Sequence, residues 1–135
     1  MVTISSANTI DMASSPILAI RRGVSRSVAR RIKRLLGKLM PHIPMKHALV
    51  VTVVPGNVIQ TPSGKRAFGL FRASGNGIEI CIAGTPIRNM TTIDDIERTL
   101  CHEFAHYEQF RDGRRLQERG VKVRAENLRR KALAA

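Results

Sequence analysis

The sequence has few aromatic residues and no tryptophan. Aromatic side chains make up 4% of the 135 residues. Stacking platforms for nucleic-acid bases are therefore scarce, which counts against a single-strand-binding module. The core has to be built from Val, Ile, Leu, Ala and Met. An apolar content of 43% suffices for one compact core but leaves little for a second.

Long apolar runs are also missing, and no secretory leader is expected. No segment approaches the roughly 20 apolar residues of a membrane span, and the first twenty residues lack a basic region followed by an apolar stretch. We therefore expect a cytoplasmic protein, or a virion-associated one if the chain is viral. The only cysteines, Cys81 and Cys101, form no C-x-x-C pair and lie in apolar surroundings. They are expected to be reduced core thiols.

Acidic residues are few in the first half of the chain. The formal net charge is +13, from 23 Lys and Arg against 10 Asp and Glu. Residues 1–66 hold eleven basic residues against Asp11 alone, whereas residues 67–135 hold twelve against nine acids. A strongly cationic chain attracts phosphate backbones and other anionic surfaces. The basic excess lies mostly outside the half that carries the motif described below.

The N-terminal part divides into an extension and a helix. Residues 1–22 show no helical or strand period and are predicted to be a flexible extension, followed by a single domain over residues 23–135. Apolar residues from Val24 to Leu39 recur at helical spacing, which predicts an amphipathic helix that ends before Pro41. Its basic face is either a solvated outer surface or a nucleic-acid-binding patch, formed by Arg26, Arg30, Arg31, Lys33, Arg34 and Lys38.

Three strands and two helices are predicted after this first helix. The strands cover Ala48–Val54, Ala67–Ala73 and Ile78–Ala83, and small residues between the last two indicate a hairpin. Thr92 is expected to cap a helix that ends near residues 111–113, and a final helix is expected from about Arg115 to Ala132. The fold class is therefore α+β, with a short three-stranded sheet and a C-terminal helical hairpin.

The segment His102-Glu103-Phe104-Ala105-His106 carries the chemistry. Residues four apart project from the same side of a helix, so the two imidazoles can bind one Zn²⁺ at about 2.0–2.1 Å. Glu103 lies beside them and can take a proton from a water molecule that the metal has made acidic. These three residues predict a hydrolytic zinc site, with Glu103 as the general base.

A catalytic zinc ion usually takes a third protein ligand, and no histidine follows His106. Glu118 and Glu126 are the candidates. Glu118 is expected on the inward stripe of the last helix, together with Val121, whereas Glu126 points about 100° away from that stripe. We therefore favour Glu118 and keep Glu126 as the alternative third ligand.

The HEXXH segment resembles the zincin metallopeptidases that have a glutamate as third zinc ligand. The run from Glu118 to Ala125 loosely resembles the E-x-x-A-(D/N)-x-x-A pattern of small phage and bacterial ImmA/IrrE-type peptidases, but Val121 replaces the usual Ala and Lys122 replaces the usual Asp or Asn. The chain is also similar to SprT-like peptidases. The resemblance implies a minimal zincin-like fold and a polypeptide substrate. It also implies that Gly77–Ala83 is the edge strand that pairs with this substrate.

Two functions follow from these observations. The first is a zinc metallopeptidase, a hydrolase of peptide bonds. The alternative is a basic nucleic-acid-associated protein, or a viral structural or assembly protein, in which the zinc site is regulatory or vestigial. Steep salt dependence of binding to DNA or RNA is the property that would distinguish the nucleic-acid-associated protein.

Overall fold

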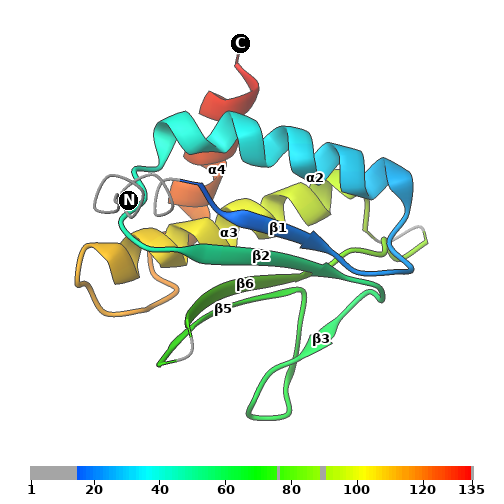
Figure 1. Cartoon of the computed structure of the whole chain (residues 1–135), viewed down its shortest axis with the longest axis horizontal. Helices are drawn as coiled ribbons and strands as arrows, with labels where there is room; N and C mark the ends of the chain where they lie inside the picture. The colour runs from blue at the N-terminus through cyan, green and yellow to red at the C-terminus, as the bar shows by residue number, and fades with distance from the viewer. Residues whose placement is uncertain (1–14, 76, 89–90, 135) are drawn as a thin grey trace, which may run out of the picture.

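A sheet covered by helices on one side forms the body of the molecule. The computed structural model describes residues 15–75, 77–88 and 91–134. The three α-helices of these residues lie over one side of a four-stranded sheet, and a two-stranded ribbon projects from it (Figure 1). The fold is α+β, as predicted. The elements are, in order, β1 (Ile17–Ile20), α2 (Arg26–Leu39), the 3₁₀-helix η1 (Met40–His42), β2 (Leu49–Val54), β3 (Ile59–Gln60), β4 (Arg66–Ala67), β5 (Gly69–Ser74), β6 (Gly77–Ala83), α3 (Ile93–Arg111) and α4 (Val121–Leu133).

The strand order in the main sheet is β1-β2-β6-β5. Strands β1, β2 and β6 are parallel, and β5 pairs antiparallel with β6. The two inner strands carry alternate β-branched residues that are fully buried, namely Val51, Val53, Ile80 and Ile82. Their neighbours in each strand face the other side of the sheet. Among the described residues, β5 and β1 are therefore the edges of this sheet.

Three of the four strands, β2, β5 and β6, lie where the sequence predicts them. The fourth strand lies inside the segment 1–22 that was expected to be flexible, so that expectation is wrong from Ile17 onward. A run of four residues is too short to show a strand period, and hydrogen bonds to β2 stabilise it instead. Residues 1–14 of the expected extension lie outside the described residues.

The first helix matches its predicted apolar stripe. Its buried residues are Val28, Ile32, Leu35, Leu36 and Leu39, and the Ser25 hydroxyl caps it by accepting a hydrogen bond from the Val28 N–H. The helix ends at Leu39, before Pro41, as expected.

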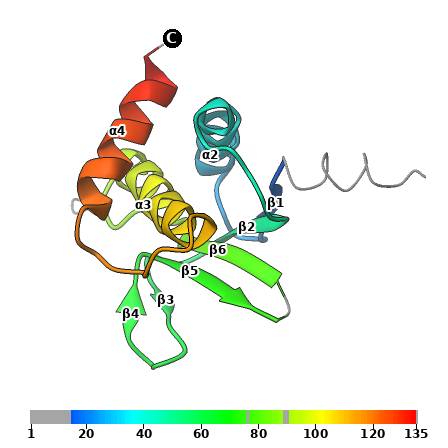
Figure 2. The same ribbon diagram turned by 90° about the vertical axis from the view of Figure 1, so that its left-hand side faces the viewer.

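Helix α3 lies directly against β5 and β6. It begins at the predicted cap, where Thr92 and Asp95 bond to each other's backbone N–H groups in a capping box. Gly113 follows its end with a φ of +71°, which a glycine adopts without strain. Helix α4 packs on α2 and α3, farther from the sheet (Figure 2).

The start of the last helix differs from the prediction. Helix α4 begins at Val121, whereas the sequence indicated about Arg115. Gly120 has a φ of +81°, a left-handed conformation through which an α-helix cannot run. Residues 112–120 are instead an exposed connection between α3 and α4. Glu118 therefore lies on a loop, and the expected place on a helical stripe is wrong.

Both cysteines are free, as expected. Burial raises the pKa of Cys101 to about 12, so this thiol stays protonated in the core. Within the described part of the chain, no helix has the length and apolar character needed to cross a membrane.

A buried carboxylate joins the three helices. Glu97 of α3 accepts hydrogen bonds from Arg31 of α2, at 2.9 and 3.1 Å, and from Arg129 of α4, at 3.3 Å. The Glu97 side chain is 4% exposed and that of Arg129 is 18% exposed. In such buried ion pairs, each charge is stabilised by its partner because little water is left to solvate it.

We expect Glu97→Ala to lower the free energy of unfolding by about 2 kcal/mol, because the largely buried Arg129 then loses its hydrogen-bonded acid and keeps only a longer contact with Asp94, at 3.7 Å. The value is below that of a fully buried pair because Arg31 is partly exposed and keeps Asp94. Urea unfolding measures the loss. In the control, Arg72→Ala breaks an exposed pair with Glu79 and should cost less than about 1 kcal/mol. Equal losses in the two variants would contradict a special role for Glu97.

Candidate metal centre

Two histidines of α3 face a common point. His102 and His106 are one helical turn apart, and their ring centroids are 5.0 Å from each other. The opposite side of the same helix is in the core, where Leu100, Phe104 and Tyr107 are fully buried. Helix α3 therefore has one face that packs and one face that presents polar groups.

Glu118 reaches both histidines from the loop. Its Oε1 lies 3.0 Å from Nε2 of His102, and its Oε2 lies 2.8 Å from Nε2 of His106. Glu118 is the third ligand that the sequence favours, and the structure brings it together with the two histidines. Its expected place on the inward stripe of a helix is wrong, because Glu118 stands on the loop before α4. The Glu118 side chain is 76% exposed, so its position depends on the loop.

The alternative third ligand, Glu126, lies outside this group. It is on α4, exposed, with Oε1 3.5 Å from Nε of Arg98. Arg98 also pairs with Asp95. The place of Glu126 is therefore set by an ion pair between two helices.

The three groups fit a metal ion. One ligand atom from each of His102, His106 and Glu118 can be chosen so that all lie within 4.8 Å of one another. Tetrahedral ligands about 2.0–2.1 Å from one ion are about 3.4 Å apart, so only small movements of these side chains are needed. Two imidazole nitrogens and one carboxylate make a donor set that divalent transition metals accept.

Glu103 follows His102 directly and lies beside the group. Its side chain is buried, and burial raises the pKa of its carboxyl to about 7, with Glu118 adding to the rise and His106 opposing it. Among the described acids it is the one without an Arg, Lys or His ion-pair partner. A carboxyl that titrates near neutral pH can both take and release a proton.

Gly69, at the start of β5, is a site residue that the sequence analysis missed. A Cβ atom there would lie 2.6 Å from Cγ2 of Thr99 and 2.9 Å from Oε2 of Glu103. Only a glycine lets the strand pass this close to the carboxylate. A glycine inside a predicted strand is the signal that could have indicated such a close approach.

A cleft of about 990 Å³ lies over these groups. Residues 67–71 line one wall, and the loop with the start of α4 lines the other. Two of the chain's exposed large apolar side chains, Phe68 and Leu116, lie on these opposite walls. The cleft thus combines a polar floor with apolar walls.

The strand expected to accept a peptide is not the edge strand. Gly77–Ala83, which is β6, has β2 on one side and β5 on the other, so its backbone groups are already paired. The strand at the edge beside the cleft is β5. The sequence could not show this, because strand order is set by pairing between distant segments.

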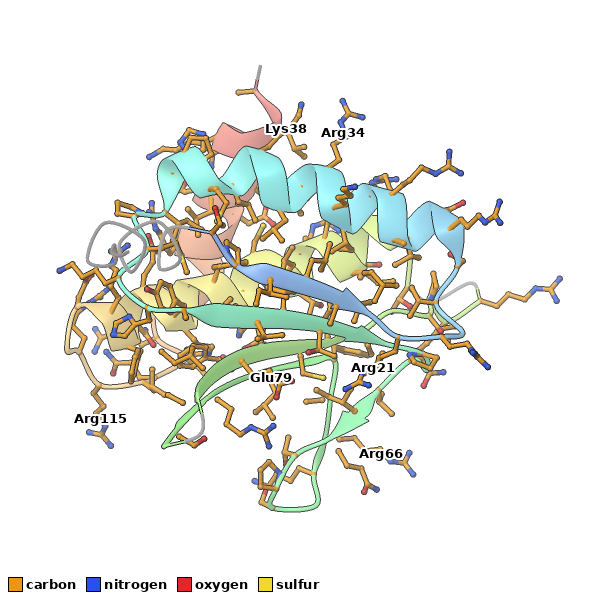
Figure 3. All side chains as sticks on the ribbon, in the orientation of Figure 1. Arg21, Arg34, Lys38, Arg66, Glu79 and Arg115 are labelled. Carbon is orange, nitrogen blue, oxygen red and sulfur yellow. The ribbon has the colours of Figure 1, made fainter. Side chains whose placement is uncertain are left out.

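The basic residues of α2 differ in their exposure and in their ion-pair partners. Arg31 turns toward α3, where it pairs with Asp94 and Glu97, so it is part of the helix packing. Lys38 is half-buried. Figure 3 shows Arg34 and Lys38 on the side of α2 away from the sheet. The remaining basic residues of this face are exposed and have no ion-pair partner among the described residues, namely Arg26, Arg30, Lys33 and Arg34.

No known protein family, curated protein or solved structure matches this chain.

We expect Glu103→Gln to stabilise the metal-free protein at pH 8 by about 2 kcal/mol. The folded protein keeps a proton on Glu103 up to a pKa of about 7, whereas an ordinary glutamate releases it near 4.5. The stability of the wild type therefore falls, relative to the variant, as the pH rises from 4.5 to 7. Urea unfolding in the presence of a chelator, at pH 4.5 and pH 8, measures the difference. A gain of the same size at both pH values would disprove the shifted pKa.

Proposed function

We propose that this protein is a zinc-dependent metallopeptidase with a minimal zincin-like fold. The observation that carries the proposal is the meeting of His102, His106 and Glu118 beside the buried Glu103, at the floor of a cleft bounded by a sheet edge. A cytoplasmic location agrees with two free cysteines.

Zinc is the metal that we propose for this donor set. Two histidine nitrogens and one glutamate oxygen leave a fourth position open, which is the arrangement of catalytic zinc sites. When bound, zinc lowers the pKa of a water molecule and polarises a carbonyl oxygen. The protein's part is to hold the ligands and to keep one side of the site accessible from the cleft.

Glu103 is proposed as the general base. Its carboxylate accepts a proton from the attacking water and passes it to the amide nitrogen of the leaving group. The pKa of about 7 applies to the metal-free protein. A nearby cation lowers the pKa of a carboxyl, so Glu103 is ionised and ready to act as a base at neutral pH in the loaded protein.

The polypeptide substrate is proposed to lie along β5. An extended peptide can add a strand to an exposed sheet edge through backbone hydrogen bonds. The start of β5, at Gly69, passes close to Glu103, so a peptide on this edge has its backbone near the general base. Phe68 and Leu116 offer apolar contacts on either side.

The test uses purified protein and a fluorescently labelled unfolded polypeptide as substrate. The wild type should bind about one zinc ion per chain by elemental analysis and cleave the substrate. Glu103→Gln should keep the metal and lose at least about 100-fold in kcat/KM, because it removes the general base. In the control, Glu79→Gln makes the same change on the other side of the sheet and should leave cleavage unchanged.

Two results would overturn the proposal. A wild type that binds no zinc would exclude the metal centre. Cleavage by Glu103→Gln at the wild-type rate would exclude Glu103 as the base.

Association with nucleic acid is a second candidate function, favoured by the exposed face of α2. This helix contains no acidic residue, and its exposed arginines and lysine have no ion-pair partner among the described residues. Elsewhere in the described chain, all acids except Glu103 are already paired with an Arg or His side chain. The charge on α2 is therefore free to meet phosphates.

Binding to a 20-base-pair DNA duplex tests this function. We expect measurable affinity at 50 mM salt that falls steeply by 200 mM, because each phosphate contact releases counterions. Replacing Arg30 and Arg34 with Ala should weaken binding and reduce the salt dependence. The control replaces Lys65 and Arg66, on the β3–β4 ribbon, and removes the same charge. Equal losses in the two double variants, or no binding at low salt, would rule out the helix as the binding surface.

A further inference from the structure

A buried glutamine on α3 contacts both segments of the candidate metal centre. Gln109 follows His106 by three residues and is 4% exposed. Its Oε1 lies 3.0 Å from Nδ1 of His106. Its side chain also forms two hydrogen bonds with the backbone of Gln117, the residue before Glu118.

The contacts with Gln117 fix the orientation of the amide. The Gln117 N–H donates to Oε1 of Gln109, at 3.2 Å, and Nε2 of Gln109 donates to the Gln117 carbonyl oxygen, at 3.0 Å. If the amide were flipped, its NH₂ group would face the Gln117 N–H, and its oxygen would face the Gln117 carbonyl oxygen. Neither pair could form a hydrogen bond. The group that meets His106 is therefore the amide oxygen, which can only accept.

This places a proton on Nδ1 of His106, because Oε1 of Gln109 can only accept. Nε2 of His106 faces Glu118, at 2.8 Å from Oε2, and in the metal-free protein a proton has to lie between these two acceptors. When that proton leaves, Nε2 has a lone pair while Nδ1 keeps its proton, which is the form that binds a metal ion. The hydrogen bond thus prepares the nitrogen that would bind a metal ion.

Gln109 also holds the loop at two points. Its backbone carbonyl accepts from the Arg114 N–H at 2.8 Å, and its side chain binds Gln117. Residues 112–120 are exposed along their length and form neither helix nor strand. A loop of this kind has little packing of its own, so a few hydrogen bonds to a buried partner determine its path.

We propose that Gln109 is a positioning residue that sets two of the three metal ligands at once, by orienting His106 and by placing the loop that carries Glu118. This inference rests on the proposed metal centre and adds to it a defined outer partner. Such partners typically change metal affinity 10- to 100-fold when they are removed.

The first measurement needs no variant. In the zinc-loaded wild type, ¹⁵N NMR of the histidine rings should show His106 with the proton on Nδ1 and with Nε2 as the metal-bound nitrogen. The opposite tautomer would overturn the proposal.

The second measurement compares two substitutions. Gln109→Met fills a similar space without hydrogen bonds and should weaken zinc binding about 10- to 100-fold in a competition with a chromophoric chelator. It should also speed trypsin cleavage of the metal-free loop at Arg115 and Arg119. Gln109→Glu keeps two acceptor contacts but cannot donate to Gln117. It should bind zinc more tightly than the Met variant, yet its loop should be cleaved faster than that of the wild type.

The control is Gln60→Met, on the exposed strand β3, which should match the wild type in both assays. Wild-type zinc affinity in Gln109→Met, or a loop in Gln109→Glu as resistant as that of the wild type, would overturn the proposal while leaving the metal centre intact. A wild type that binds no zinc would instead reject the metal centre itself. The two failures are therefore distinguishable, and neither readout depends on peptidase activity.

Discussion

The candidate site depends on one geometric constraint, which is that donors from two separate segments have to meet within a few ångströms. Helix α3 supplies two of the donors, since its periodicity places two imidazoles on one side. The third donor, Glu118, is on an exposed loop with no regular structure and is largely solvated. Hydrogen bonds from the buried part of α3 to the loop backbone are what make the meeting point definite.

The packing of α3 holds the helix that carries both histidines of the candidate site. Its apolar side lies on β5 and β6, and Tyr107 binds the Lys46 N–H at 3.0 Å and His47 through its hydroxyl. Glu97 fixes the first half of the helix to α2 and α4. Because these contacts already fix the backbone of α3, little further conformational entropy is lost when its exposed side binds a ligand.

Regular elements were predictable where their period was long enough to read. The apolar stripe of α2, the Thr92 cap and the three longer strands were all placed correctly from local patterns. The four-residue strand β1 and the order of the strands were not, because long-range pairing determines both. The grouping of His102, Glu103 and His106 followed from helical spacing. The loop position of Glu118 did not, because it depends on the left-handed backbone at Gly120.

The missing side chain at Gly69 has a consequence for how the cleft could change. Any larger residue there would push β5 away from α3 or displace the carboxylate of Glu103, since both Thr99 and Glu103 occupy the space. The spacing between the sheet edge and the acid is thus set by the absence of a single methyl group. Substitutions that change which ligands the cleft prefers are more easily accommodated at Phe68 or Leu116, because these side chains already extend into solvent.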